Sequence, residues 1–104
     1  MESYIMETNI VTKQKDEVKV KKPKHYKVVM YNDDYTTMEF VINVLVVVFN
    51  KNIIEAEKIM LDVHERGKGI AGIYSYDIAF TKVSVAMSMA KEKGFPFKLT
   101  VEEA

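Results

Sequence analysis

Two segments of the chain pair hydrogen-bond acceptors with methionine at spacings that suit a ligand pocket. Residues 32–40, NDDYTTMEF, bring amide and carboxylate acceptors to the start of a predicted helix, next to Met38. Residues 60–68, MLDVHERGK, put His64 four positions after Met60, so the two side chains share one helical face. We predict a small pocket with a polar wall and an apolar floor. It suits a ligand that carries a cation beside an apolar group, such as the free N-terminus of a polypeptide.

The polar residues of the first segment also have a structural explanation, which is the commoner one for such residues. Asn and Asp are favoured where a strand turns into a helix, and acids offset the positive helix N-terminus. In this sequence, however, Thr36 and Glu39 fit a capping box that already satisfies the helix start. Asn32, Asp33 and Asp34 are then surplus acceptors that can bind a metal ion or an ammonium group.

His64 and the methionines are open to the same two interpretations. A lone histidine on a helix is more often a surface residue than a ligand, and Met38, Met60 and Phe97 fit an ordinary core. A neutral imidazole nevertheless has one acceptor nitrogen that can take a hydrogen bond from an ammonium group. Seven methionines in 104 residues is a high count, and methionine is favoured where a surface must accept several apolar shapes. If His64 lies near Asn32, the two segments form one pocket.

The composition limits the function classes. The 15 basic residues balance 15 acidic ones, which argues against a general nucleic-acid binder that needs excess cations to meet phosphates. There is no cysteine, and therefore no disulfide framework, thiolate zinc site or thiol nucleophile. The longest apolar run, residues 44–49, is too short to span a bilayer, and the first residues lack the apolar segment of a secretion signal. We expect a cytoplasmic protein with no membrane and no nucleic acid among its partners.

Catalysis is the weaker hypothesis. Asp33, Asp34 and His64 could serve a metal-dependent hydrolase, but the only other histidine is His25, and no HxxxH spacing occurs. No nucleophile stands in a recognisable context, and no Gly-rich phosphate loop precedes a helix. We therefore expect no catalytic residues, no metal and no cofactor.

The hydrophobic pattern predicts one α+β domain over residues 25–104, preceded by a flexible extension over residues 1–24, where charges are scattered without periodicity. Three strands are expected where β-branched and aromatic residues run together or alternate, at residues 26–31, 68–74 and 97–101. Together with three helices they give the order β-α-α-β-α-β. The expected architecture is an antiparallel three-stranded sheet packed against three helices.

Each predicted helix follows a capping candidate and carries an apolar stripe. The first begins at Thr36 and ends near Phe49, the second follows Asn52 and stops at Gly67, and the third runs to Lys93. Their predicted buried stripes are Met38, Val41, Ile42, Leu45 and Phe49; Ile53, Ala56, Met60 and Val63; and Ala79, Val83, Ala86, Met87 and Ala90.

At these positions the chain resembles the ClpS family, the adaptor of the Clp ATP-dependent protease that reads N-terminal degradation signals. The resemblance extends from about Tyr26 to the C-terminus. Its separated motifs occur in the same order as in the family: NDDYT and MEFV within residues 32–41, ML and VH within 60–64, GK at 67–68 and TKV at 81–83. It implies an adaptor that binds N-degron substrates, which begin with a free Leu, Phe, Tyr or Trp, and delivers them to the ClpA unfoldase and its protease.

The resemblance also implies roles for individual residues. Asn32, Asp33 and His64 match the positions that hold the α-amino group of the substrate. Six residues match the hydrophobic pocket for the first side chain, namely Thr36, Met38, Val41, Met60, Val63 and Phe97.

Three further residues match a gatekeeper and a docking surface. The chain also departs from the family pattern at two places. Met38 matches a gatekeeper that excludes β-branched first residues, and Asp77 and Lys82 match positions that dock on the N-terminal domain of ClpA. Thr37 replaces a common proline, which the start of a helix tolerates. The valines at 46–48 replace a more polar stretch and leave self-association open.

Two non-enzymatic alternatives remain beside the metal-dependent hydrolase. A recognition domain of a ubiquitin ligase can share such a pocket, but those domains stand in much longer chains. A structural module like the compact domain of the ribosomal stalk protein has a related shape. Such a module has no reason to hold Asn32, Asp33 and His64 together.

Overall fold

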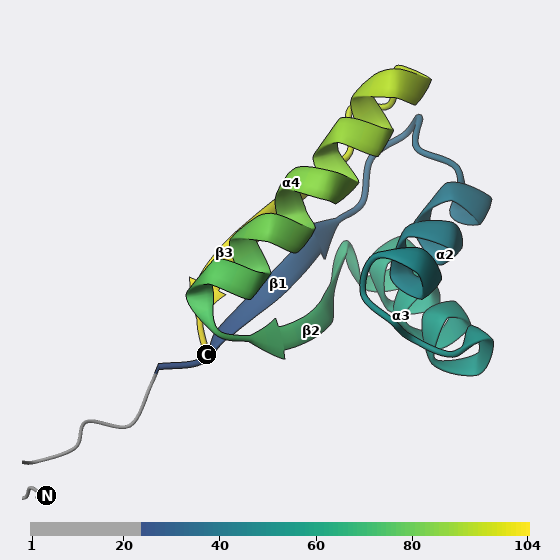
Figure 1. The fold of residues 1–104 in the computed structure, drawn as a ribbon. Coiled ribbons are helices and arrows are strands. Elements are labelled where there is room, and N and C mark those ends of the chain that lie inside the picture. Colours follow the sequence, from purple (N-terminus) through teal and green to yellow (C-terminus); the bar gives the residue numbers. More distant parts are fainter. Residues whose placement is uncertain (1–23) are drawn as a thin grey trace, which may run out of the picture.

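The computed structural model describes residues 24–104, and its elements follow the predicted order β-α-α-β-α-β (Figure 1). The elements are β1 (Tyr26–Tyr31), α2 (Met38–Val47), α3 (Ile53–Arg66), β2 (Lys68–Tyr74), α4 (Tyr76–Lys93) and β3 (Lys98–Glu103). The α+β class and the three-stranded antiparallel sheet are therefore confirmed. The predicted extension, residues 1–24, lies outside the described residues except for Lys24.

The sheet has the order β2-β1-β3, and both pairings are antiparallel. The central strand contains the run Val28, Val29 and Met30, each at most 4% exposed, as expected for a strand covered on both sides. Between β1 and β2 the register shifts, because Val28 pairs with Gly72 but Val29 pairs with Ile70. The extra residue in β2 makes a bulge, which is the bend that the glycines of this segment predict.

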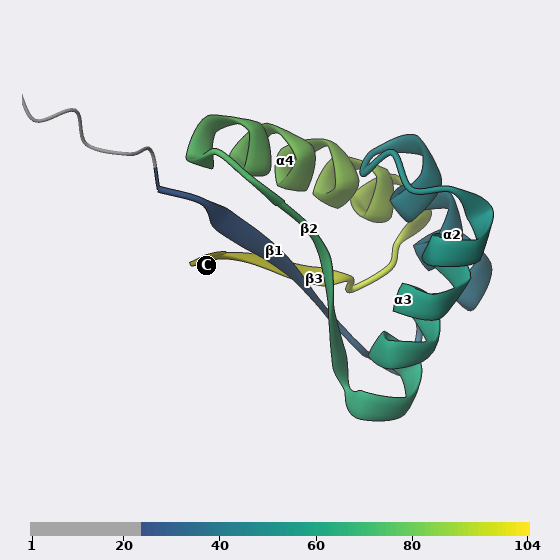
Figure 2. The same ribbon diagram turned by 90° about the horizontal axis from the view of Figure 1, so that it is seen from below.

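Two helical layers cover the sheet differently. Figures 1 and 2 show α4 along one face of the sheet, while α2 and α3 lie as a pair beside β2. The inner side of α4 carries Ala79, Ala86 and Ala90, each at most 1% exposed, and such small side chains let a helix approach a sheet closely. The remaining core comes from α2, α3, the three strands, the turn after α2 and the segment before β3: Val28, Met30, Phe40, Val41, Val44, Leu45, Val48, Phe49, Ala56, Met60, Val63, Ala71, Phe97 and Leu99.

The helix starts differ from the prediction in one respect that affects the site. The N-cap of α2 is Thr37, not Thr36, and its hydroxyl accepts a hydrogen bond from the Phe40 backbone N–H at 3.1 Å. Asn52 caps α3 as predicted, accepting from the Glu55 N–H at 2.9 Å. The ends of α3 and α4 fall at Gly67 and Gly94, both in the left-handed conformation that glycine adopts without strain.

Three apolar residues predicted to be buried are exposed instead. Met38 is 44% exposed, Ile53 is 56% exposed and Met87 is 39% exposed. Met38 and Ile53 are the first residues of their helices, so their side chains lie beyond the neighbouring core. The first helix also ends at Val47, so Phe49 belongs to the turn that follows the helix, although its side chain is buried as predicted.

Candidate functional site

The connection from β1 to α2 is a turn that Asp33 closes with its own carboxylate. One carboxylate oxygen, Oδ1, accepts from the backbone N–H groups of Tyr35 at 2.8 Å and Thr36 at 2.7 Å. The other, Oδ2, accepts from the Thr36 hydroxyl at 2.7 Å. This is an Asx-type turn, in which the side chain replaces a backbone acceptor. Asp33 is therefore not the surplus acceptor that the sequence predicts, because it sets the start of α2.

These bonds also explain the ionisation of Asp33. Partial burial raises the pKa of its carboxyl, but the hydrogen bonds from the Thr36 backbone, the Thr36 hydroxyl and the Tyr35 backbone lower it by more. The net result is a pKa below the ordinary value of 3.8. Asp33 thus stays charged at neutral pH and holds the turn as a carboxylate.

A single backbone hydrogen bond joins this turn to the end of α3. The Asn32 N–H donates to the Gly67 carbonyl at 2.9 Å. Gly67 follows the last turn of α3, which carries His64. The two segments that the sequence singles out are thereby brought to one place, although 32 positions separate Asn32 from His64.

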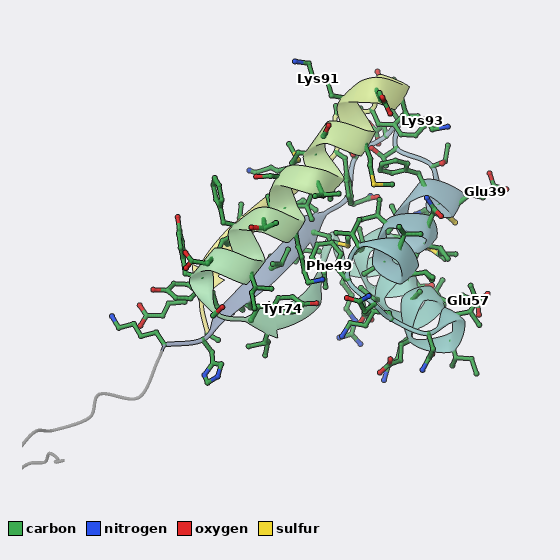
Figure 3. All side chains as sticks on the ribbon, in the orientation of Figure 1. Glu39, Phe49, Glu57, Tyr74, Lys91 and Lys93 are labelled. Atoms are coloured by element: carbon green, nitrogen blue, oxygen red, sulfur yellow. The ribbon has the colours of Figure 1, made fainter. Side chains whose placement is uncertain are left out.

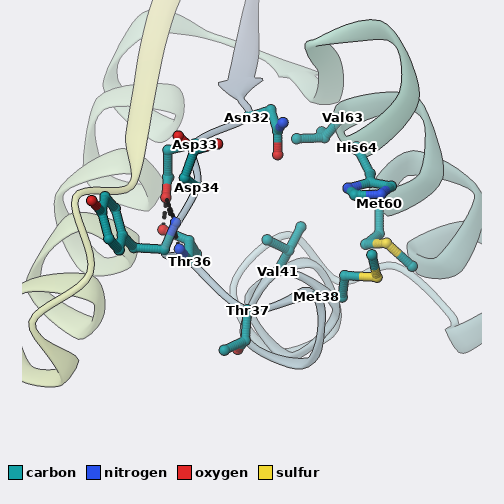
Figure 4. Close-up of a pocket in the computed structure, with 11 residues that line it drawn as sticks. Asn32, Asp33, Asp34, Thr36, Thr37, Met38, Val41, Met60, Val63 and His64 are labelled. Atoms are coloured by element: carbon teal, nitrogen blue, oxygen red, sulfur yellow. Dashed lines mark hydrogen bonds between the residues drawn. The ribbon is translucent and has the colours of Figure 1, made fainter.

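A cavity of about 420 Å³ lies between these segments (Figure 4). Its size is within the ~300–1,000 Å³ range of small-molecule sites. The deepest lining side chains are apolar: Val63 is 3% exposed, Val41 is 5% exposed and Met60 is 9% exposed. The full lining is Asn32, Asp33, Asp34, Tyr35, Thr36, Thr37, Met38, Val41, Met60, Val63 and His64.

The lining includes eight of the nine residues that the sequence predicts for α-amino binding and for the hydrophobic pocket. The exception is Phe97, which is 2% exposed and does not line this cavity. Its ring packs edge-on against Phe40 with centroids 5.7 Å apart, and Phe95 packs against the same ring at 5.1 Å. Phe97 therefore supports α2 from the core side through Phe40, which lies two residues after the exposed Met38.

Three polar side chains at the cavity are not used by the fold. Within residues 24–104, the side chains of Asn32, Asp34 and His64 make no hydrogen bond or ion pair, and all three residues are exposed. The sequence predicts Asp34 as a surplus acceptor for a metal ion or an ammonium group, but the resemblance gives it no role in α-amino binding, and the structure places it on the lining. The adjacent pair Asp33-Asp34 was the available signal, because one carboxylate can close a turn while the next remains free.

The positions predicted for docking lie on α4, away from the cavity. Asp77 is exposed in the first helical turn. The Lys82 ammonium donates to the Val48 carbonyl at 2.6 Å and to Asn50 Oδ1 at 2.9 Å, and lies 5.3 Å from the centroid of the Tyr74 ring. Figure 3 shows Tyr74 beside Phe49 at this corner. Lys82 therefore closes the C-terminal end of α2, where cations are favoured.

Two further properties of the described part of the chain bear on function. Residues 24–104 contain no group of three or more His, Asp or Glu side chains placed to hold a metal ion. Asp33, Asp34 and His64 thus do not assemble as the hydrolase alternative requires. None of the helices in the described residues is both long and apolar enough to cross a membrane.

Known proteins resemble this chain over most of its length. A family model described as ATP-dependent Clp protease adaptor protein ClpS matches residues 21–100. The ATP-dependent Clp protease adapter protein ClpS of Clostridium acetobutylicum is 55% identical over 89 residues, which are 86% of this chain and 88% of that protein. Its counterpart in Acetivibrio thermocellus is 47% identical over 97 residues, which are 93% of this chain and 98% of that protein.

A solved structure agrees with these sequence matches. ClpS2 of Agrobacterium tumefaciens, bound to L-phenylalaninamide, superposes with a TM-score of 0.76 at 40% identity, covering 80% of this chain and 100% of that chain. The sequence matches and the shared fold lead to the same assignment: the chain belongs to the ClpS family of Clp protease adaptors, which are not catalytic enzymes.

Proposed function

We propose that this adaptor binds protein substrates through a free N-terminal Leu, Phe, Tyr or Trp and delivers them to a ClpA-type unfoldase. The observation that supports this most is the cavity itself, in which unused acceptors stand beside an apolar floor. L-phenylalaninamide, bound by the relative from Agrobacterium tumefaciens, has a free amine beside a benzyl group. It therefore combines the two chemical features for which the cavity is suited.

The α-amino group is held by Asn32 and His64 together with the Asp33-Asp34 pair. A buried ammonium must keep its hydrogen bonds, since an unsatisfied charge is costly to bury. Asp33 Oδ1 already accepts two bonds, so Asp33 contributes mainly its negative charge and the fixed shape of the turn. Asp34 has both carboxylate oxygens free among the described residues. We therefore add Asp34 to the acceptors of the ammonium.

The first side chain enters the apolar part of the cavity. Full burial of such a side chain contributes roughly 1.5–3 kcal/mol. The floor consists of Val41, Met60 and Val63, and Met38 forms the exposed edge. An internal Leu has no ammonium group, and an acetylated N-terminus has lost both the charge and two donors. The polar wall thus restricts binding in the apolar pocket to side chains that belong to a free N-terminal residue.

Delivery requires a second contact, with the N-terminal domain of the unfoldase. Asp77 and Lys82 on α4 are the docking residues of this proposal, and residues 1–24 form an extension that assists transfer of the substrate. Two modest affinities joined in one assembly raise the local concentration of substrate at the unfoldase.

The test is a binding series with short peptides that differ only in their first residue, each with a free and an acetylated N-terminus. Affinity is measured by fluorescence anisotropy. We expect the free Leu, Phe, Tyr and Trp peptides to bind, and the acetylated forms to lose at least about a hundredfold in affinity, or roughly 2.7 kcal/mol. Equal binding of free and acetylated peptides would rule out amine recognition. A degradation assay with purified unfoldase and protease then tests delivery separately.

A further inference from the structure

Met38 differs from the other methionines of residues 24–104. Met30 is fully buried and Met60 is 9% exposed, whereas Met38 is 44% exposed. Met87 is almost as exposed as Met38, at 39%, but lies on α4 and does not line the cavity. Met89 is half-buried. Met38 is therefore, within the described residues, the one methionine that is both open to solvent and part of the cavity wall.

The position of Met38 explains its exposure. It is the first residue of α2, directly after the N-cap Thr37, so its side chain has no preceding helical turn against which to pack. Figure 4 shows its sulfur on the same side of the cavity as that of Met60, opposite the turn of Asp33 and Thr36. Because the residue is 44% exposed, a small oxidant in solvent can reach the Met38 side chain without any opening of the fold.

We propose that Met38 is an oxidation site, and that its sulfoxide weakens binding of apolar N-terminal residues; this rests on the function proposed above. The Met38 sulfur attacks one oxygen of hydrogen peroxide, the O–O bond breaks, and the sulfur gains that oxygen while a water molecule leaves. The sulfur is oxidised by two electrons and the peroxide is reduced. Sulfoxide reductases reverse the change.

The sulfoxide alters the pocket at the place where the substrate needs an apolar surface. A sulfoxide oxygen is a strong acceptor, and burying it against a Leu or Phe side chain leaves it without a donor, which is unfavourable. The apolar floor below, with Val41 and Met60, offers no hydrogen-bond donor from its side chains. Oxidation of Met38 therefore lowers the affinity for the same apolar side chains that the unmodified cavity wall accepts.

Substrate and oxidant also compete for the same atom. A bound first side chain covers the cavity wall and reduces the access of peroxide to Met38. The structure thus predicts that saturating peptide slows oxidation at Met38 and leaves oxidation at Met87 unchanged. This difference is read directly by mass spectrometry of the digested protein.

The experiment compares the wild-type chain, Met38→Leu and the matched control Met87→Leu, each before and after graded hydrogen peroxide. The affinity for a peptide with a free N-terminal Leu is measured in each case, and every variant is compared only with its own untreated form. Met1 and Met6 remain in all three proteins, so their oxidation is common to all. We expect the wild type and Met87→Leu to lose at least about tenfold in affinity and Met38→Leu to lose less than about twofold.

Treatment of the oxidised wild type with methionine sulfoxide reductases should restore the affinity. The inference is overturned if oxidation at Met38 leaves the affinity unchanged or raises it, or if peptide does not protect Met38. These wild-type measurements decide the matter even if Met38→Leu binds poorly. Failure of the proposed function would be seen in a different measurement. In that case the untreated wild type would bind free and acetylated peptides with equal affinity.

Discussion

The two polar walls of the cavity differ in how far the fold itself uses their hydrogen-bonding groups. In the turn of residues 33–36, the carboxylate of Asp33 accepts three hydrogen bonds from Tyr35 and Thr36. On the opposite side, the His64 side chain has no partner within residues 24–104. One wall is therefore organised before any ligand arrives, while the other keeps its acceptor free. The difference separates residues that build the site from residues that act on the ligand in the proposed function.

Replacement of Asp33 by Ala should have the largest effect, because it removes the wall that is already organised. Two backbone N–H groups and the Thr36 hydroxyl lose their acceptor. Hydrogen bonds to charged groups contribute roughly 1.5–3 kcal/mol, so we expect a loss of about 2 kcal/mol in the free energy of unfolding, measured by urea denaturation. Peptide affinity should fall at least about tenfold at the same time.

Asp34→Asn is the matched control for that change, since it alters the neighbouring carboxylate that the fold does not use. We expect its free energy of unfolding to stay within about 0.5 kcal/mol of the wild type, while the affinity for a free N-terminal Leu peptide falls. If instead Asp34→Asn destabilises the protein as much as Asp33→Ala, the distinction between the two carboxylates is wrong.

The same turn has a defined pH dependence. The pKa of Asp33 is lower in the folded protein than its ordinary value of 3.8. Its contribution to stability is therefore fully present above pH 3.8, and is lost as the pH falls through the lower, folded value. Wild type should lose stability relative to Asp33→Asn over that acidic range, as followed by urea denaturation at stepped pH. Parallel curves would contradict the assignment.

The sequence predicted the elements well because their signals are local. Residues 26–31 were assigned with correct bounds, since β-branched and aromatic residues end at an Asn-Asp turn. Asn52 and Gly67 marked the ends of α3 through cap chemistry that needs no tertiary information. Part of the cavity was predictable for a related reason, because Met60 and His64 stand four residues apart on one helical face and the acceptors of residues 32–34 precede a helix start. The resemblance to the ClpS family implied the rest of the residue set.

The errors arose where two neighbours of like chemistry compete for one role. Thr36 and Thr37 both fit an N-cap, and Asp33 decides between them by binding the Thr36 hydroxyl. That bond depends on the backbone path of the turn, which local propensity does not specify. Phe97 was assigned to the pocket by the resemblance alone, and the alternating pattern around it predicts that it is buried without showing which cavity or core it faces.

Met38→Ala tests the apolar edge of the cavity, where selectivity by shape is expected. Met38 is exposed on the cavity lining, and in the proposed function its thioether limits the width available to a β-branched first side chain. A change of a single methyl in such a pocket is worth about 1–3 kcal/mol. We expect the preference for Leu over Ile or Val as the first residue to fall about tenfold, from anisotropy titrations with the three peptides. The unfolding midpoint should change little, since Met38 is not a core residue.

His64 offers a smaller effect that tests the other wall. An imidazole nitrogen can accept a hydrogen bond, and in the proposed function that of His64 accepts from the substrate ammonium. His64→Ala removes this acceptor, so peptide affinity should fall about fivefold in anisotropy titrations. His64→Gln keeps an acceptor at the same position and should retain more of the affinity. An equal loss in both variants would contradict the role of His64 as an acceptor.

The same comparison applies to Lys82 on α4. Like Asp33, and unlike His64, its side chain already makes hydrogen bonds within the fold. Its ammonium is already bonded to the Val48 carbonyl and to Asn50, so Lys82→Met should cost stability even without an unfoldase. The site is partly exposed, and we expect only about 0.5 kcal/mol by urea denaturation. Asp77→Asn is the matched change on the same helix, where no such side-chain bond is lost. We expect both variants to weaken binding to the unfoldase domain, but only Lys82→Met to be destabilised. This result would mean that Asp77 contacts the unfoldase directly. Part of the effect at Lys82 would then come from the loss of its hydrogen bonds at the C-terminal end of α2.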